Sequence, residues 1–101
     1  LDFIKSASTL TSEEVDSDKT TGIKLAVEAG KKGGTMPAVF DAANEVAVEL
    51  FLGRRIGFLD IYKAIEEAMK NHEILAGDIL ENIKMADKEA REYVYKNFGG
   101  K

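Results

Sequence analysis

The sequence predicts an all-α protein, a four-helix bundle over residues 20–101 that follows an extended N-terminal arm over residues 1–19. Four segments repeat apolar residues at the three- and four-residue spacing of a helix. Glycines follow most of these segments, where a helix would end. Residues 1–19 lack helical periodicity and are dense in Ser, Thr and Asp, which favours an arm held to the core by a few apolar side chains.

The first predicted helix runs over residues 20–32 and has two apolar sides. One face carries apolar or small residues at helical spacing: Ile23, Ala26, Val27 and Gly30. Leu25 and Ala29 lie on the opposite side, so we expect this helix to be covered twice. Gly33 and Gly34 end it, because glycine adopts the left-handed conformation at a helix C-terminus at low cost.

The second predicted helix begins at Thr35 or Met36, with Pro37 in the first turn, where its missing N–H costs nothing. One half of this helix is continuously apolar and should form the core: Val39, Phe40, Ala42, Ala43, Val46, Ala47, Leu50 and Phe51. Gly53, Arg54 and Arg55 close it, with the arginines where the helix dipole favours cations.

The other half of the second helix is mixed and carries the candidate functional residues. Asp41, Asn44, Glu45 and Glu49 lie there, with Val48 and Leu52 among them. The three carboxylates follow i, i+4, i+8 spacing, which permits an acid/base or metal-binding row but more strongly favours a solvated or docking face. Asparagine is a poor mid-helix residue, so we expect the Asn44 amide to bond a neighbouring segment.

Two further helices complete the bundle. Asp60 is expected to cap a helix over residues 60–71. Asp78 with Glu81 has the spacing of a capping box, which opens either a short turn or a fourth helix that runs to Phe98. The inner face of the third helix should carry Ile61, Ala64, Ile65, Ala68 and Met69. That of the fourth should carry Ile83, Ala86, Ala90, Val94 and Phe98.

The composition excludes several classes of function. Fourteen Lys and Arg against eighteen Asp and Glu give a net charge of -4, the wrong sign for a nucleic-acid binder. No cysteine is present, so disulfides and thiolate catalysis are excluded. No apolar stretch is long enough to span a membrane and no signal peptide is recognisable, which predicts a cytoplasmic protein without a membrane partner. Because the first residue is Leu1, we expect a piece of something longer.

No catalytic, cofactor-binding or metal site can be assembled from these residues. GKKGGT, residues 30–35, has its lysines in the wrong order for a phosphate-binding loop and is expected to be a plain turn. A di-metal centre in a bundle needs Glu-x-x-His pairs, but His72 is the one histidine and Met69 precedes it by three. We expect His72 to end the third helix as a polar residue.

The run GGTMPAVFDAANEVAVELFL, followed by RRIGFLDIYKAIE, strongly resembles the C-terminal domain of the 1-deoxy-D-xylulose 5-phosphate reductoisomerase family. The matching positions are Gly33, Gly34, Pro37, Ala38, Val39, Ala42, Ala43, Asn44, Glu45, Val46, Ala47, Val48, Phe51, Leu52, Ile56, Phe58, Asp60, Ile61, Ile65 and Glu66, with Asp87, Ala90 and Arg91 near the end. Two places depart from the family pattern: Asp41 replaces the usual asparagine, and the path of residues 12–22 is open.

The resemblance implies that residues 1–101 are one C-terminal helical domain. It places an NADPH-binding domain and a central catalytic domain outside this chain. By resemblance, the whole enzyme is a homodimeric oxidoreductase that uses NADPH and a divalent metal, Mg or Mn. It converts 1-deoxy-D-xylulose 5-phosphate to 2-C-methyl-D-erythritol 4-phosphate in isoprenoid synthesis. The fragment alone should be inactive and should support the catalytic domain.

The polar face of the second helix would then dock onto that catalytic domain, through Asp41, Asn44, Glu45 and Glu49. Two other interpretations stay open. In one, the chain is a free-standing helical module that uses the same face to bind a separate protein. In the other, it is a small metalloenzyme, which bound metal on elemental analysis would reveal.

Overall fold

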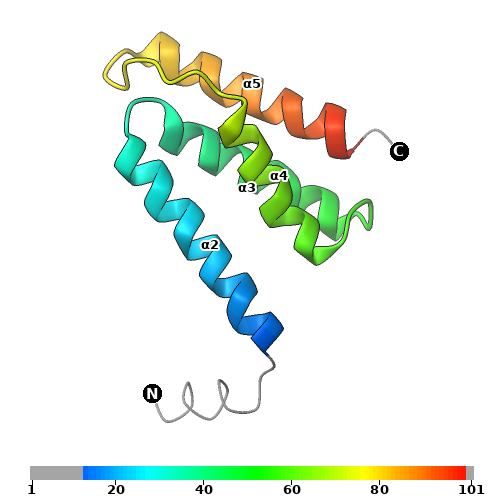
Figure 1. The fold of residues 1–101 in the computed structure, drawn as a ribbon. Coiled ribbons are helices and arrows are strands. Elements are labelled where there is room, and N and C mark those ends of the chain that lie inside the picture. Colours follow the sequence, from blue (N-terminus) through cyan, green and yellow to red (C-terminus); the bar gives the residue numbers. More distant parts are fainter. Residues whose placement is uncertain (1–12, 100–101) are drawn as a thin grey trace.

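The computed structural model describes residues 13–99, and the side chains of residues 20–99. Four helices make up this part: α2 (Glu13–Lys32), α3 (Met36–Leu52), α4 (Phe58–Lys70) and α5 (Leu80–Phe98), with no strand among the described residues (Figure 1). The predicted all-α, four-helix architecture is confirmed. None of the helices in the described part is long and apolar enough to cross a membrane.

Helix α3 lies at the centre and contacts each of the other three helices. α3 and α5 run in the same direction, and α4 returns the chain between them (Figure 1). α2 approaches from the other side and packs on α3 and α4. Because α3 is covered by α4 and α5 on two sides, its apolar half must be broad, as the sequence predicts.

The core is built mainly from α3 and α4. α3 contributes Met36, Val39, Ala42, Ala43, Val46, Ala47 and Leu50. α4 contributes Ile61, Ala64, Ile65, Ala68 and Met69, and α5 contributes Ala86, Ala90 and Val94. The small residues let helices approach closely, while Met36 and Ile65 fill the space between them. The predicted inner face of α4 is therefore confirmed, and those of α3 and α5 are confirmed in large part. Phe40, Phe51 and Phe98 are only partly buried against the core, and Ile83 is partly buried outside the core cluster.

The turn between α2 and α3 depends on two glycines. Gly33 and Gly34 have φ of 65° and 57°, the left-handed conformation that other residues adopt at a cost. A Cβ on Gly34 would lie 2.5 Å from the carbonyl oxygen of Leu75, so this turn also touches the α4–α5 connection. GKKGGT is therefore a turn between helices, as expected.

Helix α3 ends in a motif that the sequence does not reveal. The backbone N–H of Arg54 donates to the carbonyl of Phe51, and that of Arg55 donates to the carbonyl of Leu50, at 2.9 Å each. This pair of bonds is a Schellman motif with Gly53 as the C-cap. Arg54 occupies its left-handed position, with φ of 63°, although glycine is the residue usually found there.

Three helix starts differ from the expectation. α2 begins at Glu13, so residues 13–19 are helical rather than extended, and the rest of the predicted arm lies outside the described residues. α4 begins at Phe58 after the N-cap Gly57, whose N–H donates to Asp60 Oδ2 at 2.8 Å. Asp60 is thus the third helical residue. α5 begins after Ile79 without a side-chain cap bond, so no capping box forms at Asp78.

The inward face of α2 is the one carrying Leu25 and Ala29, which are 6% and 2% exposed. Ile23 and Val27, on the side with the longer apolar stripe, are 64% and 49% exposed. Within the described structure α2 is therefore covered once. Gly22 explains in part why the side with Leu25 and Ala29 faces inward. A Cβ at Gly22 would lie 2.9 Å from the Tyr62 ring, so the absence of a side chain lets α2 approach α4 closely here.

Candidate functional site

The four candidate residues of the polar face lie on the exposed side of α3. Asp41, Asn44, Glu45 and Glu49 are all exposed in the structure. We call these four residues the polar α3 face. The structure joins two of them to α5 and leaves the other two at the surface.

Glu45 is held by a charged side chain from α5. Its Oε1 accepts a hydrogen bond from Arg91 Nη2. Arg91 Nε also donates to Asp87 Oδ1 and Oδ2, at 3.0 and 3.2 Å. The hydrogen bond to Glu45, and then that to Asp87, raises the pKa of Arg91 above its ordinary value. Arg91 therefore orients the Glu45 carboxylate and balances part of the negative charge on this side.

Glu49 is held one turn further along both helices. Tyr95 donates its hydroxyl proton to Glu49 Oε1 at 3.0 Å, and this bond raises the pKa of Tyr95. Each bonded pair joins residues 46 apart in the sequence. The constant separation follows from the parallel course of α3 and α5, in which residues four apart on both helices stay in register.

Asp41 and Asn44 have no hydrogen-bond or ion-pair partner among the described residues. The expected bond from the Asn44 amide to a neighbouring segment is thus not found within this part of the chain. An exposed carboxylate and an exposed amide, on a helix that is otherwise fixed, are free to bind polar groups of another surface. On the polar α3 face, Glu45 and Glu49 are therefore bonded to α5, whereas Asp41 and Asn44 can bind another surface.

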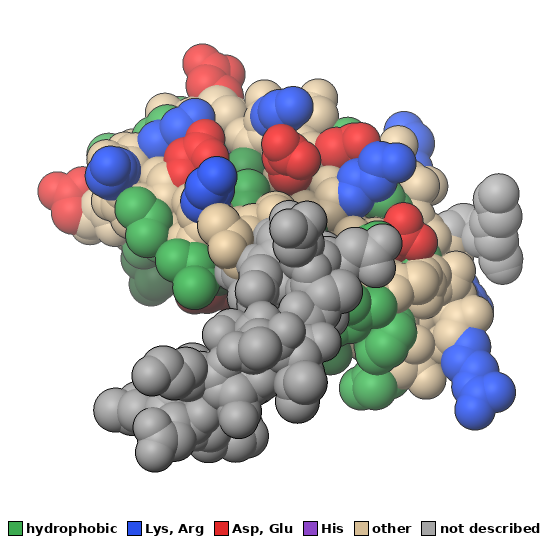
Figure 2. Space-filling view, turned by 60° about the horizontal axis from the view of Figure 1, so that its bottom comes forward, with side chains coloured by type: hydrophobic (Ala, Val, Ile, Leu, Met, Phe, Trp, Pro, Cys, Tyr) green, Lys and Arg blue, Asp and Glu red, His purple; other side chains and the backbone are tan. Residues whose placement is uncertain are grey.

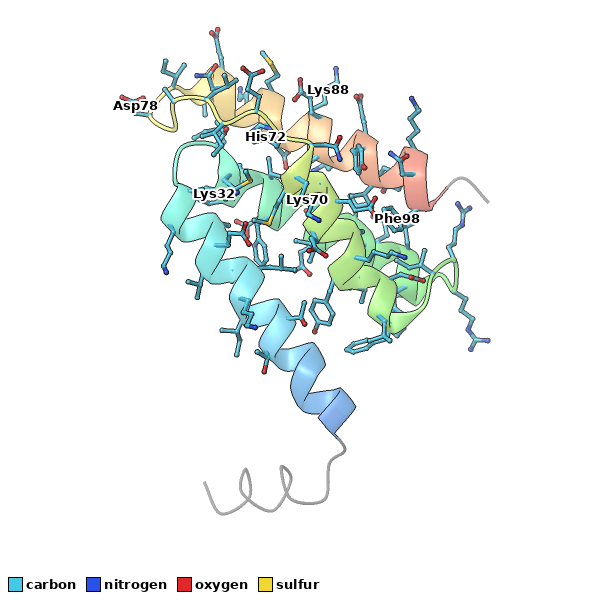
Figure 3. All side chains as sticks on the ribbon, viewed as in Figure 1. Lys32, Lys70, His72, Asp78, Lys88 and Phe98 are labelled. Carbon is cyan, nitrogen blue, oxygen red and sulfur yellow. The ribbon has the colours of Figure 1, made fainter. Side chains whose placement is uncertain are left out.

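Sequence reasoning missed a buried polar connection around Thr35. This residue is 0% exposed. Its Oγ1 forms a hydrogen bond of 2.6 Å with His72 Nε2 and accepts the Leu75 N–H at 2.9 Å. The Thr35 N–H in turn donates to the Leu75 carbonyl at 3.1 Å. His72 follows α4, as expected, but it fastens the α4–α5 connection to the start of α3 (Figure 3).

A hollow of about 290 Å³ lies between the end of α4 and the middle of α5. Its lining residues are Val39, Ala68, Asn71, His72, Glu89, Ala90 and Tyr93. Asn71 Nδ2 donates to Tyr93 Oη at 3.0 Å, and Tyr93 donates to Glu67 Oε1 at 3.4 Å. Asn71 and Tyr93 thus bond each other beside the hollow and join the end of α4 to α5. Among the described residues, no group of three or more His, Asp or Glu is arranged to hold a metal ion.

The fold and the polar α3 face define a small helical-bundle domain whose central helix carries a row of exposed polar side chains, two of them bonded to α5. The profile of the DXP reductoisomerase C-terminal domain matches residues 1–93. The chain belongs to this family. The resemblance drawn from the sequence is thereby confirmed, and the interpretation as a free-standing module is not supported.

Individual relatives agree with the family profile. The 1-deoxy-D-xylulose 5-phosphate reductoisomerase of Clostridium botulinum strain Hall is 49% identical over 98 residues, which are 97% of this chain and 25% of the relative. The enzyme of the same name from Exiguobacterium sp. is 43% identical over 88 residues, which are 87% of this chain and 23% of the relative.

A solved structure shows the same arrangement of helices. The 1-deoxy-D-xylulose 5-phosphate reductoisomerase of Zymomonas mobilis, in complex with NADPH, matches with a TM-score of 0.70 and 40% sequence identity. The match covers 77% of this chain and 21% of the Zymomonas chain. This chain therefore spans about a quarter of the length of the relatives that it matches.

Proposed function

We propose that this chain is the C-terminal helical domain of a 1-deoxy-D-xylulose 5-phosphate reductoisomerase. In that role it packs against the catalytic domain and supports its shape. Two observations carry the proposal. The family profile matches residues 1–93, which are nearly all of this chain, and the chain spans only about a quarter of the length of its relatives. The whole enzyme would convert its substrate to 2-C-methyl-D-erythritol 4-phosphate with NADPH and a divalent metal, in the cytoplasm and as a homodimer.

The residues of this chain are assigned no step of the reaction. By the family resemblance, we place NADPH on an N-terminal domain and the metal, Mg or Mn, on a central catalytic domain, both outside this chain. What this domain contributes is a rigid surface. A catalytic domain held against such a surface keeps its reacting groups in place, and small displacements of those groups are costly to the rate.

We propose that the polar α3 face is that surface. Glu45 and Glu49 are fixed by Arg91 and Tyr95, so they lose little conformational freedom when a partner binds. Asp41 and Asn44 are the members whose side chains have no partner within the described part of the chain. A carboxylate that loses water at an interface requires a compensating donor, so we expect an Arg, a Lys or backbone N–H groups opposite Asp41.

The experiment replaces Asp41 and Asn44 with alanine in the full-length enzyme. We expect a lower rate of NADPH oxidation or a lower melting temperature. In the isolated chain the same change should leave the bundle folded and slightly more stable, since alanine favours a helix over asparagine or aspartate. Replacing both Asn44 and Glu45 tests the same face, but it also breaks the bond to Arg91.

The matched control replaces Lys63 and Glu66, two exposed residues on the outer side of α4, with alanine. This variant should match the unmodified enzyme in both measurements. Unchanged activity and melting in the Asp41 and Asn44 variant would refute the assignment of the polar α3 face.

A further inference from the structure

The side of α2 that faces away from the core has the properties of a second contact surface. Ile23 and Val27 lie exposed on it, four residues apart and therefore on the same face of the helix. Exposed hydrophobic side chains are visible on the face shown in Figure 2, mostly below the charged groups that occupy the upper part of that view. The opposite side of α2 is already buried in the bundle. The bundle itself therefore does not require the exposed aliphatic pair on the outer side.

A shallow groove of about 480 Å³ follows this side of the helix. Six of the described residues line it: Ile23, Lys24, Val27, Glu28, Lys31 and Lys32. We call these six residues the outer α2 face. The described lining therefore combines an aliphatic pair, Ile23 and Val27, with three lysines and one glutamate, and we call these four charged residues the rim of the groove.

The rim is positive in a protein that is negative overall. Lys32 pairs with Glu28 at 3.3 Å, whereas Lys24 and Lys31 have no ion-pair partner among the described residues. Three lysines and one glutamate give the outer α2 face a net charge of +2, against -4 for the whole chain. Such a face attracts a negatively charged surface and repels a second positive one.

We infer that the outer α2 face docks onto the remainder of the full-length polypeptide, at an apolar ridge flanked by carboxylates. This inference rests on the proposed function. About three quarters of the relatives' length lies outside this chain, which provides the surface. The outer α2 face and the polar α3 face have opposite charge and lie on different helices, so each requires a different part of that surface.

A second copy of the chain is the less suitable occupant. A stable interface between separate molecules buries roughly 800 Å² on each partner, more than one side of six helical residues supplies. Two like-charged rims would also face each other in a symmetric pair. A covalently joined partner has neither limitation, because the tether gives it a high effective concentration and a small contact is then sufficient.

The test measures the reaction of single cysteines with a maleimide. The chain contains no cysteine, so Val27→Cys introduces a unique reporter into this domain. Leu80→Cys, an exposed position at the start of α5, is the matched control, and Asp41→Cys reports on the polar α3 face. Each variant is made in the isolated chain and in the full-length enzyme from which the other cysteines have been removed.

We expect Val27→Cys to react at least about tenfold more slowly in the full-length enzyme than in the isolated chain, and Leu80→Cys to react equally in both. Adding Lys24→Glu and Lys31→Glu should restore fast labelling of Val27→Cys, because carboxylates would then face carboxylates. Adding Lys63→Glu instead should leave the labelling slow.

Several results overturn the inference. Equal rates at Val27→Cys in the two proteins show an open face. Slow labelling already in the isolated chain shows that the chain covers itself. Protection that grows with protein concentration shows a second copy. Fast labelling at Asp41→Cys alone refutes docking of the polar α3 face and leaves this inference standing, so the two failures are distinguishable.

Discussion

At the scale of single residues, Thr35 joins two segments that lie far apart in the sequence. Its hydroxyl and its backbone N–H together tie the α4–α5 connection to the first turn of α3. A buried hydroxyl with two partners cannot be replaced by a methyl group without leaving polar atoms unpaired. The sequence around GGT predicts the helix start but not this role, since His72 and Leu75 lie about forty residues away.

Thr35→Val should lower the free energy of unfolding by about 1–2 kcal/mol, because the Leu75 N–H and the His72 ring lose their partner at a partly buried place. Urea unfolding of the isolated chain measures this change. Thr35→Ser keeps the hydroxyl and should retain most of the stability. Equal losses in the two variants would show that the methyl group, rather than the hydrogen bonds, matters here.

Arg54 is a second residue whose backbone conformation matters more than its side chain. It takes the left-handed position at the end of α3, where an L-residue is disfavoured by roughly 1–2 kcal/mol. Arg54→Gly should therefore raise the free energy of unfolding, by about 0.5–1 kcal/mol once the greater freedom of unfolded glycine is included. Arg54→Ala removes the charge but keeps the strain, so the same urea measurement should show no comparable gain.

At the scale of helices, the proline, the glycines and the apolar spacing predict the position and the core face of α3. Gly33, Gly34 and Pro37 predict the start of α3, and Gly53 predicts its end. The apolar half of α3 predicts most of the core residues that this helix supplies. The face of α2 could not be chosen in the same way. Both of its sides carry apolar residues at helical spacing, and the side that packs inward is set in part by the close approach of Gly22 to Tyr62, which no local pattern encodes.

The polar α3 face was predicted by its residues but not by its internal contacts. The mixed half of the helix indicates a contact surface of some kind. That α5 would supply Arg91 and Tyr95 to this face depends on the parallel course of two helices with a third between them. Periodicity describes each helix separately and carries no information about such a pairing.

Tyr93 joins α5 to the end of α4 through hydrogen bonds with Asn71 and Glu67. Burial first, and then the charge of Glu67, raises its pKa above the ordinary value of about 10. A raised pKa means that the neutral form is favoured by folding, so this stabilisation is present below pH 10 and is lost as the pH rises through the folded value. We expect the free energy of unfolding to fall above about pH 10.

The measurement is urea unfolding at several alkaline pH values. Tyr93→Phe should show a smaller fall, and adding Tyr95→Phe should reduce it again, because the pKa of Tyr95 is raised as well, chiefly by its bond to Glu49. An unchanged pH dependence in the double variant would contradict this assignment.

At the scale of the whole molecule, two connections far apart in the sequence meet. The turn between α2 and α3 touches the α4–α5 connection, where Gly34 lies against both Leu75 and Gly77. This contact, with the Thr35 hydrogen bonds beside it, fastens one end of the bundle. The domain can therefore present the polar α3 face and the outer α2 face in fixed positions relative to each other.

Gly34→Ala should lower the free energy of unfolding by more than about 1 kcal/mol, because the new methyl group meets a carbonyl and the left-handed backbone is disfavoured. Gly30→Ala is the matched comparison. It lies inside α2 with nothing within 4 Å of its Cβ position, so it should gain about 0.5–1 kcal/mol. Thermal unfolding of the two variants should therefore shift in opposite directions.

The parallel course of α3 and α5 also imposes an order on how the chain assembles. α3 and α4 are neighbours across a short link, whereas α5 can dock only after α4 has brought the chain back. Closing the shorter loop costs less entropy, so we expect an early α3–α4 hairpin and late arrival of α5, seen as low φ-values at Ala90 and Val94. Until then Glu45 and Glu49 repel each other without the charge of Arg91 nearby, and a nascent chain stalled before α5 emerges would display the α5-facing side of α3 to chaperones.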